Sequence, residues 1–407
     1  MTLIECFTAA HVDNIAACLR LCPEKLVMVG DAEQMREPVL RYRALLQRRG
    51  MRTEIAMCDV GGKDLADTYA ALNSLVCQKS QCVIDLTGGE ETVIMAVGAV
   101  LAGLDSKQRE NIRVEKFDRA AGAVVDCANG KRMLPGEDVA LTVEELIALH
   151  GGSMQPGAYQ PAADCGPRDL AGLWHIVADA PRNWNRAIML LNEFESRADS
   201  KTDISLPLQS LQGGISGFEQ KETIVRDLLG KLQQRGVIDD QSSRYALEYT
   251  YRSSMLRYCT LKAGNVLEVK TLLEGRAARE NGELLFQDGR MSVSIDWDGV
   301  IGNPAQRVPE TRNEIDVVLM HGTTPLFISC KNGNIDDGEL YKLNTVADRF
   351  GGPYARKMLV ATDLDQKSPA ANRAFIQRAW DMDILLVTDA AQLTQEEWQQ
   401  IFQKAVQ

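Results

Sequence analysis

The chain has 407 residues, of which 45% are hydrophobic and 25% are charged, so it has room for two or three globular domains. Its net charge of −11 argues against a generally basic coat for nucleic acid, but it allows a local basic groove or a small anion bound by backbone amides. No apolar run approaches the length of a membrane span, and the N-terminus lacks the features of a signal peptide. The ten cysteines lack paired CxxC spacing, which indicates free thiols in a reducing compartment. We therefore expect a cytoplasmic protein without membrane contacts.

Residues 1–150 alternate short apolar strands with helices. We expect strands near residues 2–7, 25–30, 52–60 and 81–86, each followed by a helix with one apolar face. Because the strands are apolar throughout, the pattern predicts an α/β domain with a parallel, Rossmann-like sheet and helices on both faces. Ligands of such sheets bind beyond the carboxyl ends of the strands.

Two of these carboxyl ends carry candidate ligand-binding loops. After the fourth expected strand, Thr87-Gly88-Gly89 runs straight into a helix; glycines let the backbone approach a ligand, and free amides suit a phosphate. A plain strand-to-helix turn is an equal alternative, and Glu90 and Glu91 count against an anion directly beside them. With no Walker lysine and no spaced GxGxxG, the sequence favours neither an ATPase nor a dinucleotide site.

A Gly- and Pro-rich stretch at residues 151–167 marks a domain boundary. Residues 151–250 are expected to form a small helical segment, and residues 235–239 resemble the exit of a winged-helix unit. Because a basic recognition helix is missing, we interpret this segment as a spacer or dimerisation module rather than a reader of DNA.

The C-terminal part, residues 251–407, is organised around a predicted hairpin of residues 313–320 and 326–331. Ile315, Val317 and Leu319 are expected to share its apolar face. If residues 322–325 form the turn, Asp316 lies opposite Lys331, and both side chains can meet one ligand. An Asp that holds a divalent cation beside a charge-stabilising Lys suits phosphodiester cleavage, although an ordinary cross-strand ion pair is the commoner explanation.

A third element favours the nuclease interpretation. Glu268, on an expected helix at residues 262–273, shares a face with Leu261 and Leu272 and should point inward. The order of Glu268, Asp316 and Lys331 resembles the PD-(D/E)xK restriction-endonuclease-like superfamily over about residues 250–390. That resemblance implies a catalytic set of Glu268, Asp316 and Lys331, with Mg²⁺ or Mn²⁺ held by Glu268 and Asp316. The superfamily has an acid where this chain has Ser329, so Glu268, Glu314 or Glu339 would have to replace it.

The N-terminal loops, in turn, resemble those of the CARF (CRISPR-associated Rossmann fold) family. The matching segments are residues 7–14 and 87–89, and the resemblance implies ligand contacts from Thr8, His11, Asn14, Thr87, Gly88 and Gly89. Joined to a PD-(D/E)xK domain, the whole chain is similar to the CARF nucleases of type III CRISPR antiviral defence. This implies a homodimer, activated by cyclic oligoadenylate (cyclic tetra-adenylate in particular), that cleaves single-stranded DNA or RNA.

Two other functions stay open. A ligand-sensing, nucleic-acid-binding regulator with an inactive nuclease fold would explain Ser329. A restriction or repair nuclease whose N-terminal domain merely dimerises would cleave without a second messenger. The sequence does not distinguish DNA from RNA, set the ring size of the activator, or show whether the protein degrades it.

Overall fold

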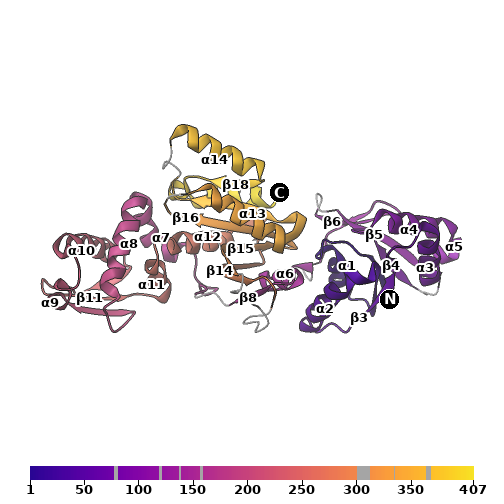
Figure 1. Cartoon of the computed structure of the whole chain (residues 1–407), viewed down its shortest axis with the longest axis horizontal. Helices are drawn as coiled ribbons and strands as arrows, with labels where there is room; N and C mark the ends of the chain where they lie inside the picture. The colour runs from indigo at the N-terminus through magenta and orange to yellow at the C-terminus, as the bar shows by residue number, and fades with distance from the viewer. Residues whose placement is uncertain are drawn as a thin grey trace.

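The computed structural model describes residues 1–77, 81–118, 122–136, 139–155, 159–299, 312–333, 335–363 and 368–407. Three bodies lie in a row, and their spatial order differs from their order in the sequence (Figure 1). The C-terminal part lies in the middle, between the N-terminal domain and a largely helical body. We call that body, residues 159–262, the helical module. Among the described residues, every helix is too short or too polar to cross a membrane.

The N-terminal domain is built on a seven-stranded sheet of order β3-β2-β1-β4-β5-β6-β7. The first five strands in this order are parallel, whereas the pairings of β5 with β6 and of β6 with β7 are antiparallel, so the predicted parallel sheet is confirmed. Its strands are β1 Thr2–Cys6, β2 Lys25–Gly30, β3 Glu54–Asp59, β4 Cys82–Asp85, β5 Ile112–Asp118, β6 Ala123–Asp126 and β7 Arg132–Met133. Its helices are α1 Asp13–Leu21, α2 Ala32–Arg48, α3 Leu65–Cys77, α4 Glu91–Gly103 and α5 Ser106–Arg109. The strand order reverses between β1 and β4, and the loops that leave a sheet at such a point form its usual ligand crevice.

The helical module contains a three-stranded antiparallel sheet of order β10-β11-β9 beside its helices. The winged-helix-like character expected for this segment stays a prediction. The elements are α7 Pro167–Asp179, α8 Pro181–Glu195, β9 Asp203–Pro207, α9 Leu208–Gln212, α10 Phe218–Gln234, β10 Ile238–Asp240, β11 Ala246–Tyr251 and α11 Ser254–Leu261.

The C-terminal part is built on a six-stranded sheet of order β18-β17-β16-β15-β14-β8. Its edge strand β8 Ser153–Gln155 and the preceding helix α6 Val143–Leu149 come from before the helical module, so this sheet begins earlier in the chain than the expected boundary at residue 251. The other elements are α12 Asn265–Ala277, β12 Arg279–Glu280, β13 Glu283–Leu284, β14 Asp288–Asp296, β15 Arg312–His321, β16 Thr324–Lys331, α13 Asp337–Gly351, η2 Gly352–Tyr354, β17 Arg356–Ala361, α14 Pro369–Asp381, β18 Ile384–Val387, η3 Ala390–Gln392 and α15 Gln395–Val406.

The central hairpin has a shorter turn than predicted. His321 pairs with Thr324, so the turn has two residues, and Gly322 takes the left-handed φ of +57° that such turns require. The predicted four-residue turn is therefore wrong. Continued along the strands, the observed register places Asp316 opposite Ser329 instead of Lys331. Because side chains alternate with a period of two, this two-residue shift leaves the expected face unchanged.

The apolar face predicted for β15 is interrupted at Asp316. Val317 packs in the core beneath α12, whereas Ile315 packs in the core on the other face of the sheet. The neighbouring strand changes face at the same level, with Met291 in the first core and Val293 in the second. Between them Ser292 has a φ of +48°, so a local backbone distortion accompanies the change.

Candidate active site

Two strands of the six-stranded sheet and one helix packed against it bring the predicted nuclease residues together. Glu268 lies in the first turn of α12, Asp316 lies on β15, and Lys331 ends β16. The predicted helical face of Glu268 was partly wrong, because Leu261 belongs to α11 and is 44% exposed, whereas Leu272 is buried. Glu268 nevertheless points inward and lies beside the strands.

Asp316 is held in place by the neighbouring strand. Its Oδ2 accepts hydrogen bonds from the Cys330 amide at 2.6 Å and from the Ser329 hydroxyl at 3.2 Å. The Lys331 ammonium lies 3.8 Å from the same oxygen. Burial nevertheless raises the pKa of Asp316, against the lowering effect of Lys331 and of both hydrogen bonds.

Lys331 is oriented from the opposite side by Glu339, in the first turn of α13. Its Nζ lies 2.9 Å from Oε2 of Glu339, whose Oε1 binds Lys342 at 3.0 Å. Burial alone would lower the pKa of Lys331, but Asp316 and Glu339 outweigh it, and the pKa is raised. Although burial acts in the other direction, the two lysines lower the pKa of Glu339. Glu339 therefore acts on the site indirectly, by orienting Lys331.

Glu268 carries the least compensated negative charge of the site. Burial raises its pKa to about 7, and the charges of Asp316 and Glu314 add to the shift. Its Oε2 accepts a 3.3 Å hydrogen bond from Ser292, the residue at the distorted point of β14. Glu314 itself is exposed, and it acts on Glu268 and Asp316 through its charge.

The donor chemistry of these carboxylates fits a hard divalent cation. Glu268 lies close enough to Asp316 for that charge to raise its pKa, and a bound cation would relieve this repulsion. Oxygen ligands of this kind suit Mg²⁺ or Mn²⁺. Within the described ranges, however, no three His, Cys, Asp or Glu side chains already form a metal-binding group. The fit therefore rests on two carboxylates and their charge.

The predicted ligand loops of the N-terminal domain meet between β1 and β4. A Cβ added to Gly88 would lie 2.4 Å from Cγ2 of Thr8, and one added to Gly89, whose φ is +108°, would lie 2.6 Å from Cβ of Cys6. Glycines at both positions therefore allow the two loops to touch. Thr8 is in turn held by Asn14, whose side chain accepts from its amide at 2.8 Å and donates to its carbonyl at 2.7 Å.

Three of the predicted ligand residues already have partners within the chain. The buried Asn14 also donates to the Tyr42 hydroxyl at 3.0 Å. The Thr87 hydroxyl accepts from the Phe117 amide at 2.8 Å. The His11 ring faces Tyr42 and, 5.3 Å away, His150; burial, reinforced by His150 and two nearby arginines, lowers its pKa to about 3. The structure thus brings Thr8, Gly88 and Gly89 together and turns His11 toward the neighbouring domain.

Comparison with known proteins finds a similar domain and similar folds. Residues 260–395, which contain Glu268, Asp316 and Lys331, match the family of Card1-like endonuclease domains. Protein VC1899 from Vibrio cholerae superposes with a TM-score of 0.72 at 16% identity, over 100% of this chain and 97% of that one. Can2 from Sulfobacillus thermosulfidooxidans, in complex with cyclic tetra-adenylate, gives a TM-score of 0.65 at 16% identity over the same shares. The chain has the fold of a CARF nuclease. No curated protein sequence matches it.

Several residues of the candidate site escaped the sequence analysis. Ser292, which contacts Glu268, and the Cys330 amide, which holds Asp316, carry no motif. The helical module also reaches the candidate site. Asn185 on α8 donates to the carbonyl of Asn332 at 2.6 Å, one residue beyond Lys331. No sequence signal marks this contact, because it joins segments that lie far apart in the chain.

Proposed function

We propose that this CARF nuclease is a metal-dependent endonuclease that cleaves single-stranded DNA or RNA when cyclic oligoadenylate is bound. The observation that carries the proposal is the convergence of Glu268, Asp316 and Lys331 within the endonuclease-like domain. Two buried carboxylates beside one oriented ammonium suit a reaction that develops negative charge on a phosphate.

Each residue of this set would have a distinct role. Glu268 and Asp316 would hold Mg²⁺ or Mn²⁺, and a bound cation of this kind polarises a phosphate and acidifies a water molecule. The Cys330 amide and the Ser329 hydroxyl keep the Asp316 carboxylate in one orientation. Lys331, oriented by Glu339, would stabilise the charge that develops on the phosphate oxygens. Because Ser329 stands where the superfamily has an acid, this set lacks one carboxylate. Glu314, whose charge raises the pKa of Glu268, would supply it.

The activator site would lie at the reversal of strand order in the CARF domain. Gly88 lies against Thr8 and Gly89 against Cys6 there, and Can2, which has the same fold, binds cyclic tetra-adenylate. Asn14 would position Thr8, and Thr87 would position its own loop. His11 would lie at the edge of the site. A symmetric ring fits an isologous homodimer, so cyclic tetra-adenylate would sit on its two-fold axis.

One observation favours the second candidate, a ligand-sensing regulator with an inactive nuclease fold. Ser329 replaces an acid, and Glu339 is neutralised by two lysines, so the described residues contain no ready third carboxylate. Such a protein would bind activator and nucleic acid without cleaving.

The deciding experiment is cleavage of fluorescent single-stranded DNA and RNA with Mn²⁺, with and without cyclic tetra-adenylate. We expect cleavage only with the activator, and its loss in Asp316→Ala and Lys331→Ala. Lys342→Ala is the matched control, because Lys342 also pairs with Glu339 but is 69% exposed and lies away from Asp316. Cleavage without activator would support a restriction-like enzyme. Activator binding without cleavage would support the regulator.

A further inference from the structure

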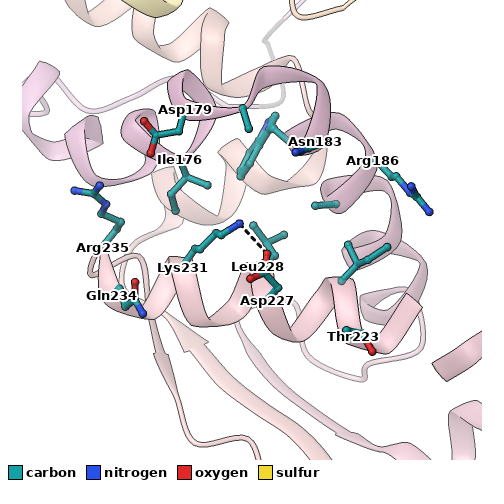
Figure 2. A pocket seen from close by; sticks show the side chains of 14 residues that line it. Ile176, Asp179, Asn183, Arg186, Thr223, Asp227, Leu228, Lys231, Gln234 and Arg235 are labelled. Carbon is teal, nitrogen blue, oxygen red and sulfur yellow. Dashed lines mark ion pairs between the residues drawn. The ribbon is translucent and has the colours of Figure 1, made fainter. Parts of the chain in front are cut away.

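A groove on the helical module lies between α10 on one side and α7 with the start of α8 on the other (Figure 2). Its volume is about 650 Å³, within the range of specific ligand sites. Ile176, Ala180 and Leu228 form apolar parts of its lining. The sequence analysis did not assign this groove a role.

The groove borders the nuclease site through the first turn of α8. Trp184, which lines the groove, donates its indole N–H to the carbonyl of Ala263 at 3.0 Å, just before the helix that carries Glu268. The next residue, Asn185, donates to the carbonyl of Asn332 immediately after Lys331. The Asn332 side chain in turn donates a hydrogen bond to the same Ala263 carbonyl at 3.2 Å. One turn of helix therefore separates the groove from the catalytic segment.

The rim of the groove presents cationic groups without neutralising partners. Arg186 and Arg235 are exposed, and neither forms an ion pair in the described part of the chain. Lys231 pairs with Asp227 at 2.7 Å, and Asp179 also lines the groove, so the lining has three cations and two anions. The positive excess is local, since the whole chain has a net charge of −11. Asn183, Thr223 and Gln234 add hydrogen-bonding groups (Figure 2).

We infer that this groove binds a stretch of single-stranded DNA or RNA and leads it to Lys331. This inference rests on the proposed nuclease function and names the surface that holds its substrate. Arginines beside a partly apolar concave surface suit the phosphates and the bases of one strand. A concave site between helices receives a strand, whereas a duplex is read by elements that project into its grooves.

Binding is tested in the Asp316→Ala protein, so that the result does not depend on cleavage. The probe is a fluorescein-labelled 20-nucleotide single strand of DNA or RNA, and the readout is anisotropy at several salt concentrations. We expect Arg186→Glu/Arg235→Glu to weaken binding about tenfold. The slope of the logarithm of the binding constant against the logarithm of the salt concentration should become shallower by roughly 0.7 for each lost phosphate contact. Arg186→Lys/Arg235→Lys should keep most of the affinity.

The matched control is Arg168→Glu/Arg244→Glu, two exposed arginines of the same module that do not line the groove. It changes the charge equally and should leave the affinity within about twofold, with circular dichroism checking that both variants fold. Equal loss in both double variants, or no loss in the groove variant, would overturn the inference. So would binding of a DNA duplex as tight as that of a single strand. If the active protein binds through the groove but never cleaves, the groove stands and the proposed enzyme function fails.

Discussion

Glu268 and Glu339 show how differently two acids of one candidate site can be charged. Burial and the neighbouring carboxylates raise the pKa of Glu268 to about 7. Glu339 gains two ammonium partners, and despite burial its pKa is lowered. Negative charge therefore accumulates beside Asp316, where a cation would bind, and is neutralised beside Lys331.

The charge of Glu268 should make the metal-free protein less stable as pH rises. Between pH 4.5 and 7 the folded chain keeps a proton that the unfolded chain releases, so the free energy of unfolding falls through this window. Glu268→Gln has no charge to desolvate, and it should be more stable than the wild type at pH 8 by about 2–3 kcal/mol in EDTA. Urea unfolding at pH 5 and pH 8 measures the difference.

Two further measurements distinguish this explanation from a general effect of the substitution. Glu283→Gln, at an exposed position on β13, should show no gain between the two pH values. Mn²⁺ at pH 8 should stabilise the wild type more than Glu268→Gln, because the cation relieves the same repulsion. A Glu268→Gln advantage of equal size at pH 5 and pH 8 would contradict the assigned charge.

At the scale of elements, period-two patterning identified the β15–β16 hairpin but not its turn. A two-residue and a four-residue turn differ by two residues in register, so both place the same side chains on the same face. The Lys331 Nζ still lies 3.8 Å from Oδ2 of Asp316, because a position two residues along the neighbouring strand is within reach of a lysine side chain. The change of face at Ser292 could not be predicted, because a serine rarely adopts a positive φ and local sequence gives no sign of it.

The contact between the two CARF loops depends on Gly88 having no side chain. A methyl group there would meet Thr8 at 2.4 Å, so Gly88→Ala must displace the loop after β1. We expect at least a tenfold loss of affinity for cyclic tetra-adenylate in isothermal titration, with about 1–3 kcal/mol of overpacking cost. Gly98→Ala, in α4, is the control, because its Cβ would have nothing within 4 Å. Unchanged affinity in Gly88→Ala would remove this loop from the activator site.

At the scale of the molecule, the six-stranded sheet joins the other two bodies through its two faces. One continuous core combines the helical module with α12 and residues such as Val317 and Leu319. A second core combines helices α1 and α2 of the CARF domain with α6, α13 and the opposite face of the sheet. The sequence predicted three parts but not this sharing, because burial between distant segments leaves no local pattern.

Helix α6 connects the CARF domain with the sheet. Arg49, just after α2, binds both oxygens of Glu145 at 2.8 and 2.6 Å and the carbonyl of Ala140 at 2.6 Å. Next to α6, the Leu141 amide donates to the hairpin turn at Gly322 over 3.0 Å. Position 49 therefore lies one helix away from the β15–β16 hairpin.

Arg49→Ala should loosen this connection at a cost of about 1–3 kcal/mol, because it leaves a half-buried carboxylate without its partner. Thermal unfolding measures the loss, and hydrogen exchange should rise in α2 and α6. The neighbouring Arg48→Ala is the control: its pair with Glu144 spans 3.5 Å between exposed side chains, so about 0–1 kcal/mol is expected. Similar losses in both variants would show that the Arg49 contacts do not hold the domains together.

The edge strand β8 also sets an order of assembly during synthesis. It leaves the ribosome long before its partner β14, and the whole helical module is made in the interval. The CARF sheet and the helical module can each complete their local strand pairs first, whereas the six-stranded sheet must wait for segments that are distant in sequence. Asp316 and Lys331 are therefore brought together late, and a nascent chain completes its N-terminal domain before its candidate active site.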